Sequence, residues 1–172
     1  MPESSTTYTG KYRGTVVNNI DPMKQGRIQV QVADVNGLTP TTWVNPCLPM
    51  AGIQSGMFTI PPVGAGVWIE FEQGDLNNPI WLGGFWGSAA TVPALAQATP
   101  PGLDNFTLQT TGQNTLIISD MPGPTGGILI KHRLGAMISI SESGIIISNG
   151  QGAMIMMSGP TVAVNGTALV VT

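Results

Sequence analysis

The chain has few of the residues that build catalytic, metal or nucleic-acid sites. Charged residues make up only 9% of the sequence and the formal net charge is −3, so we expect no basic groove and no nucleic-acid partner. Cys47 is the single cysteine, which excludes an intrachain disulfide and a cysteine metal cluster. His132 is the single histidine, so it is the only imidazole that could act as a base for a catalytic nucleophile. We therefore predict no catalytic residue, no cofactor, no metal and no enzyme activity.

Long apolar runs are absent as well. No stretch of about 20 apolar residues is present to form a transmembrane helix. The first residues, MPESSTT, have neither the basic nor the apolar part of a signal peptide. We expect a chain that is made in the cytoplasm without a signal peptide.

Aromatic residues divide the chain into two parts. Every Trp, Tyr and Phe lies at or before Phe106, and none follows it. A globular core uses such bulky rings readily, whereas a narrow fibre has no room for them. Between the two parts the sequence is rich in Pro and Ala and has no strand or helix period. We predict an N-terminal tail at 1–7, a barrel at 8–88, a linker at 89–102 and a fibrous domain at 103–172.

The first domain has the pattern of an all-β barrel. Alternating apolar runs are separated by Gly, Pro and Asn/Asp clusters, with no helical period. The predicted strands are residues 8–17, 27–35, 42–48, 66–72 and 79–85. The residues expected to face inward include Ile28, Val30, Val32, Val67, Ile69 and Phe71. Five short strands with one longer connection, at 49–64, are typical of a small closed or nearly closed OB-type barrel.

The end of the chain repeats one phrase. Residues 135–150 and 152–166 each open on Gly-Ala-Met-Ile and then follow the order strand, Gly turn, strand, Asn-Gly turn. Apolar residues alternate along both copies, but so narrow a strip cannot fold over its own apolar face. It must bury that face against other copies, which predicts a fibrous oligomer. The predicted core residues are Ile138, Ile140, Ile145, Ile147, Ile155, Val162 and Val164.

Two groups of side chains are candidates for a functional site. Glu70 and Glu72 are two residues apart on a predicted strand, and a solubilising outer face explains them better than acid/base catalysis. His132, with its basic neighbours Lys131 and Arg133, is expected to decorate the outer surface at the base of the fibre. Neither group predicts a catalytic centre.

A third group keeps a binding function open. Tyr12, with the basic residues Lys11, Arg13 and Arg27, could form a weak platform for an oligonucleotide or a sugar on an OB barrel. A ligand-binding OB module is therefore one alternative function. A trimeric tail-fibre or adhesin-type structural protein is another, since those proteins are also β-rich.

Residues 10–32, 61–75 and 79–87 resemble the OB-fold domain of baseplate central spike proteins of contractile injection systems. That family includes the phage gene-product-V type and the VgrG spikes of type VI secretion. The segments 115–120 and 126–132, with the two Gly-Ala-Met-Ile phrases, are similar to the family's needle. The resemblance implies an OB collar and a trimeric, three-stranded intertwined β-helix needle that sheath contraction drives through a cell envelope. The predicted core residues would then form the core of a homotrimer.

The same resemblance implies the partners and the location. No lysozyme or hub domain is recognisable, so the hub is expected to be a separate baseplate protein at the OB end. Because no His-x-His motif is present to hold a metal at the apex, a PAAR-type tip protein is expected on Leu169, Val170 and Val171. The expected location is a virion tail baseplate or an injection particle, and the target is a cell envelope.

Overall fold

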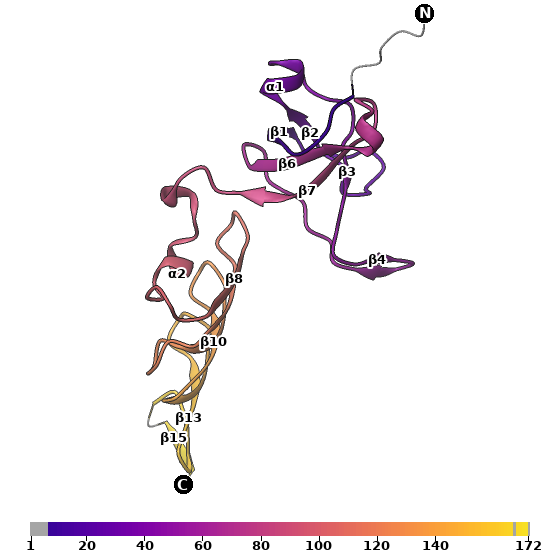
Figure 1. The fold of residues 1–172 in the computed structure, drawn as a ribbon. Coiled ribbons are helices and arrows are strands. Elements are labelled where there is room, and N and C mark those ends of the chain that lie inside the picture. Colours follow the sequence, from indigo (N-terminus) through magenta and orange to yellow (C-terminus); the bar gives the residue numbers. More distant parts are fainter. Residues whose placement is uncertain (1–6, 167, 172) are drawn as a thin grey trace, which may run out of the picture. The chain divides into compact units, whose positions relative to one another are not determined.

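The computed structural model describes residues 7–166 and 168–171, the last two by their backbone only, so the predicted tail is described only at Thr7. The chain divides into two compact units, with the boundary between Thr91 and Val92 (Figure 1). In both units the regular secondary structure is mostly strand. The helical elements are α1 (Ala33–Asn36), η1 (Glu72–Gly74), η2 (Ala89–Thr91) and α2 (Ala94–Gln97). The predicted all-β fold class is confirmed.

The first unit is a closed five-stranded barrel. Its strands are β1 (Tyr12–Asn18), β2 (Gln29–Gln31), β3 (Asn45–Pro46), β6 (Gly66–Phe71) and β7 (Pro79–Phe85), in the order β2-β1-β6-β7-β3. Only β3 and β7 pair in parallel. Val44 exchanges two backbone hydrogen bonds with Ile28, at 2.8 and 3.2 Å, and so joins the β3 end of the sheet back to the β2 end. This strand order, closed on itself, is the predicted OB-type barrel.

The barrel has a core of its own. The strands alternate as predicted, and all six residues expected to face inward are buried. The buried cluster consists of Val16, Ile28, Val30, Val32, Val44, Val67, Ile69, Phe71 and Trp81. The Trp81 indole Nε1–H donates a hydrogen bond to the carbonyl of Gly26 at 3.2 Å, which satisfies its polar atom inside the core.

Four of the five predicted strands are shorter than expected, and only the strand at 79–85 has the predicted bounds. The second predicted strand ends at Gln31, because the Asn36 side chain accepts a hydrogen bond from Val32 N (3.3 Å) and the chain turns into α1. The fourth ends at Phe71, because Gln73 adopts a left-handed conformation (φ 54°) within η1. Glu72 therefore leaves the strand, and it does not share a strand face with Glu70.

The long connection between β3 and β6 forms an arm. Within it, β4 (Ala51–Gly52) and β5 (Ser55–Gly56) make a two-stranded hairpin (Figure 1). We use the name arm for residues 49–64. Ile53 at its turn is 98% exposed, and Met50, Phe58 and Val63 are also exposed.

The second unit is an eight-stranded antiparallel meander, in which each strand pairs with the strands before and after it (Figure 1). The strands are β8 (Asn105–Gln109), β9 (Thr115–Ser119), β10 (Gly127–Lys131), β11 (Met137–Ser141), β12 (Gly144–Ser148), β13 (Met154–Ser158), β14 (Thr161–Val164) and β15 (Leu169–Val171). The strands β9 to β14 are therefore hydrogen bonded on both sides within one chain. A five-residue strand is about 17 Å long, so this sheet is a narrow strip.

Part of the predicted linker packs on the second unit. The Asn105 side-chain amide donates hydrogen bonds to the Ala96 carbonyl at 2.9 Å and to Thr99 Oγ1 at 2.8 Å. Thr99 Oγ1 also lies 3.1 Å from the hydroxyl of Ser119 on β9. Residues 96–99 are thus held to β8 and β9, although their composition is that of a linker.

Candidate functional site: an exposed apolar face

The second unit carries only apolar side chains on one face of its sheet. Residues opposite each other in paired strands share a face, and the register pairs Ile138 with Ile147, Ile147 with Ile155, and Ile155 with Val164. The same relation runs through the other strand pairs. We call this set the apolar face: Phe106, Leu108, Leu116, Ile118, Ile128, Ile130, Ile138, Ile140, Ile145, Ile147, Ile155, Met157, Val162, Val164 and Leu169.

Nothing in the described part of the second unit covers the apolar face. Ile130 is 51% exposed, and Ile140 and Ile147 are each 42% exposed. The opposite face is the better protected one, for Ile117 and Ala163 are buried there. A contiguous apolar surface of this kind on one chain marks a site of interaction.

All seven predicted core residues lie on the apolar face. Of the three predicted tip residues, Leu169 also lies on it and is 57% exposed. The side chains of Val170 and Val171 lie outside the described part of the structure, where only their backbone pairing with Ala163 and Val162 is seen.

The residues predicted from the sequence cover only the C-terminal part of the apolar face. They omit six residues of the apolar face on β8, β9 and β10: Phe106, Leu108, Leu116, Ile118, Ile128 and Ile130. Alternation within 105–109, 115–119 and 127–131 was the available signal, but these strands lie before the repeated phrase. Phe106 on β8 is the largest side chain of the face, and β14 carries Val162 and Val164 before the face ends at Leu169.

The strip also narrows toward its C-terminal end. The strands β8 to β13 have five residues each, β14 has four and β15 has three. At about 3.4 Å per residue, the width falls from about 17 to about 10 Å. Toward the C-terminal end of the sheet the strands therefore become shorter.

The basic residues near the start of the chain do not gather into a binding platform. Lys11 Nζ forms an ion pair with Glu70 Oε1 at 2.6 Å. The Arg13 guanidinium lies over the rings of Trp68 and Phe85, 5.4 and 5.3 Å from their centroids. Tyr12 packs against Phe71 beside the core, with ring centroids 5.5 Å apart. Each side chain has a partner within its own chain.

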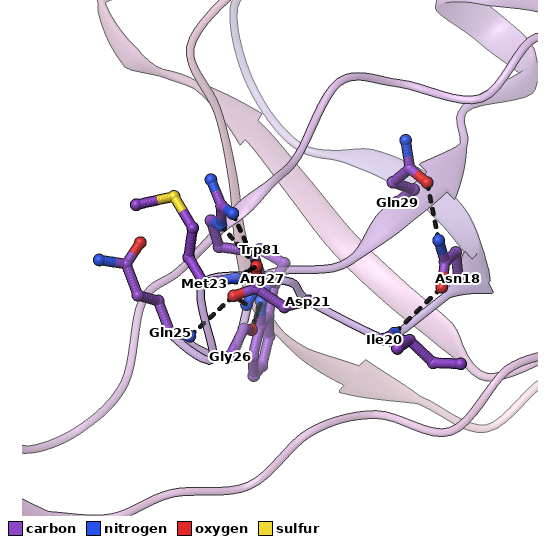
Figure 2. Close-up of polar contacts among 9 residues, drawn as sticks. All are labelled: Asn18, Ile20, Asp21, Met23, Gln25, Gly26, Arg27, Gln29 and Trp81. Carbon is purple, nitrogen blue, oxygen red and sulfur yellow. Dashed lines mark hydrogen bonds and ion pairs between the residues drawn. The ribbon is translucent and has the colours of Figure 1, made fainter.

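Arg27 is held in a polar anchor at the turn between β1 and β2 (Figure 2). Its Nη2 and Nε donate hydrogen bonds to Asp21 Oδ1 at 2.6 and 3.1 Å, and its guanidinium lies 5.4 Å from the Trp43 ring. Asp21 also accepts from the backbone N–H groups of Met23 and Gln25, at 3.0 and 2.7 Å. The bond from Arg27, with these backbone bonds, holds the pKa of Asp21 well below its usual range despite its burial. The anchor fixes the turn rather than binding a ligand.

Two kinds of feature are not found in the described residues. No three or more His, Cys, Asp and Glu side chains come together there in a way that could hold a metal ion. None of the helices described is long and apolar enough to span a membrane.

Comparison with known proteins assigns both units. Residues 12–86 match the type VI secretion system/phage-baseplate injector OB domain. Residues 105–170, which contain the apolar face, match the phage baseplate V C-terminal trimerisation domain. A search of curated proteins found no match. Proteins with these domains are structural components of phage baseplates and type VI injectors, and the C-terminal domain associates them as homotrimers. The two domains, in this order, place the chain in the family of baseplate V and VgrG-like spike proteins.

Proposed function

We propose that this protein is the central spike that punctures a cell envelope when a contractile tail or a phage-tail-like injection particle fires. The observation that carries the proposal is the apolar face, which is continuous, uncovered in one chain and narrower toward the C-terminal end. Three copies that turn this face toward a common axis would form a tapered shaft.

The proposed trimer core consists of the apolar face of three chains. Burial of apolar surface contributes about 25 cal/mol per Å², and the face extends along the whole sheet. The seven residues predicted from the repeat would occupy its C-terminal part. Because β9 to β14 satisfy their backbone groups within each chain, a shaft built this way presents few unpaired backbone groups to lipid.

The distal part of the shaft is suited to enter a membrane. From Ser143 to Thr172 the sequence has no charged side chain. Each charge moved out of water costs several kcal/mol or more, so a shaft without charges enters lipid at lower free energy. The outer face there carries Met154, Met156 and Ser158.

An added charge on the shaft tests this function. Ser158→Lys places three lysines on the outer face of the trimer, where Ser158 is exposed. We expect particles to assemble and contract but to penetrate cells less often, measured as leakage or killing per adsorbed particle. Thr42→Lys, at an exposed position on the barrel, is the matched control and should penetrate normally. Equal penetration by both variants would contradict the puncturing role.

A separate hub protein is the proposed partner of the OB unit. The arm supports this, because its apolar residues are exposed in the single chain and do not belong to the apolar face. No charged residue occurs between Asp34 and Glu70, and depletion of charge is typical of an interface core. Ile53→Ser with Phe58→Ser should abolish copurification of the hub, while light scattering still reports a trimer. Retention of the hub by that variant would place the contact elsewhere.

A PAAR-type tip protein is the proposed partner at the other end. The strand β15 lies at one end of the described sheet, with one side unpaired, and Leu169 is exposed there. Such an end is a ready docking surface for another protein. Removal of residues 167–172 should leave the trimer assembled and abolish capture of the tip protein in a pull-down. Undiminished capture by the shortened chain would refute docking on Leu169, Val170 and Val171.

A further inference from the structure

The charged residues of the second unit are sorted by sign onto opposite margins of the sheet. The residues Lys131 and Arg133 lie where β10 passes into the turn 132–136, on the same side of the strip as the turn 110–114. We call this side the basic margin. Asp104 precedes β8, Asp120 follows β9 and Glu142 follows β11, which places all three on the other side, the acidic margin. No other charged residue follows Val92.

None of these charges is neutralised by an ion pair within the described part of the chain. The two ion pairs found there, Lys11 with Glu70 and Arg27 with Asp21, both belong to the barrel. A strand of about 17 Å separates the two margins of one sheet, and charges are screened within about 8 Å at physiological salt. The two margins therefore cannot neutralise each other within one chain.

Hydrogen bonds between successive turns hold both margins in place. On the basic margin, Arg133 N donates to Asn114 Oδ1 at 3.2 Å and so ties two turns together. On the acidic margin, Gly123 N donates to Glu142 Oε2 at 2.8 Å and does the same. The charged side chains thus lie on or beside turns that are hydrogen bonded to the neighbouring turn.

We propose that the basic margin of each chain pairs with the acidic margin of the next chain around the trimer, through Lys131 and Arg133 on one side and Asp120 and Glu142 on the other. The proposal rests on the proposed inward orientation of the apolar face. Rotation about a three-fold axis carries each sheet onto its neighbour without turning it over, so unlike margins must meet at every interface.

The heights of the charges along the sheet agree with this pairing. The basic turn 132–136 joins β10 and β11, whereas the acidic turns 120–126 and 142–143 join β9 to β10 and β11 to β12. Strands are spaced about 4.8 Å apart, so with no axial shift the basic turn lies within about one strand spacing of both acidic turns. The ion pairs would set the height at which the margins meet, a task that a uniform apolar core performs poorly.

Cross-linking of the full chain tests the pairing directly. In a Cys47→Ser background, Arg133→Cys is combined with Asp120→Cys, and separately with Glu142→Cys. A short bismaleimide should give covalent trimers with at least one combination, and Arg133→Cys alone should give none. Absence of links with both combinations in a sample that light scattering shows to be trimeric overturns the margin pairing alone. Links with Arg133→Cys alone would show that like margins meet, and a monomeric sample would overturn the inward face as well.

Charge reversal provides a second test that needs no cross-link. Arg133→Glu and Asp120→Lys should each lower the temperature at which the trimer dissociates, and the shift should shrink in high salt. The double variant should recover most of the loss. Because about 17 Å separates the margins of one chain, such recovery can come only from contact between chains. If the double variant is as impaired as the sum of the single variants, and Arg133→Glu with Glu142→Lys behaves likewise, the pairing is wrong.

Discussion

The two units bury apolar side chains in opposite ways. In the barrel, Ile28, Val67 and Ile69 are fully buried by residues of the same chain. In the second unit, Ile140 and Ile147 remain 42% exposed although their strands are completely paired. Pairing of the backbone in a sheet therefore does not by itself bury the side chains. The first unit reaches both within one chain, and we propose that the second buries its apolar face against further copies of the chain.

Closure accounts for this difference. The bonds between Ile28 and Val44 bend the first sheet into a ring, so the inward side chains meet one another. The second sheet runs as a meander, and the α2 segment packs only against its first strands. A sheet with one apolar face must find a second layer. We propose that the trimer supplies that layer here.

The strongest way to break the second unit alone is a charge in the apolar face. Ile140→Asp would place three carboxylates in a dry core, at several kcal/mol each before protonation relieves them. We expect loss of the trimer by light scattering, with the barrel still folded. Ser141→Asp is the matched control, because Ser141 points the other way and an aspartate can still accept the hydrogen bond from Ser143 N. Equal damage from both substitutions would contradict the assigned face.

A cavity in the barrel should have the converse effect. Ile69 is completely buried, and Ile69→Ala should reduce the free energy of unfolding of the first unit by about 2–5 kcal/mol. The trimer should persist, as judged by light scattering below the unfolding temperature. Ile20→Ala, at a position 80% exposed, should change neither property. Dissociation of the trimer by Ile69→Ala would show that the two units depend on each other.

Glycines in the meander allow a finer test of its backbone. Gly144 has φ 122°, and a Cβ there would clash with the Met157 carbonyl oxygen. Gly152 has φ 103° but open space around it. Gly152→Ala should cost of order 1 kcal/mol for its backbone conformation, whereas Gly144→Ala should cost more because β12 and β13 must also separate. Melting temperatures of the two trimeric variants should therefore differ, and similar values would argue against this strand pairing.

The smallest expected effect concerns the polar anchor and is confined to the barrel. The pKa of Asp21 is lowered in the folded protein, so its ionised form stabilises the fold above the unfolded pKa of about 3.9. That contribution is lost as the pH falls below about 4. Asp21→Asn should melt several degrees lower at neutral pH and depend less on pH below 4 than the parent protein. Asp34→Asn, at an exposed carboxylate, is the control. A variant with an unchanged acid profile would show that the anchor does not stabilise the barrel.

Periodicity in the sequence predicts which side of each strand is apolar, and less well where each strand ends. The inward set from Ile28 to Phe71 follows from alternation, because the barrel interior requires it. The early end at Phe71 does not, because it depends on the left-handed backbone of Gln73. The α1 turn similarly depends on one side-chain hydrogen bond from Asn36 to Val32 N.

For the candidate site, the repeat pointed to the C-terminal half of the apolar face, and the half before it was missed. Phe106 and Ile130 belong to the same face, but only the strand register shows this. The sorting of charges onto two margins could not be predicted from the sequence for a similar reason. Whether Lys131 and Glu142 lie on the same side depends on how many strands and turns separate them, and a linear sequence does not state where those turns fall.

We propose that the second unit needs three chains to bury its apolar face, whereas the barrel buries its core within one chain. Light scattering on the full chain and on residues 1–102, both at micromolar concentration, tests it most directly. We predict three chains for the full-length protein and a folded monomer, or weak self-association, for the shortened one. A full-length protein that is monomeric would contradict the claim, as would a shortened chain that remains a stable trimer.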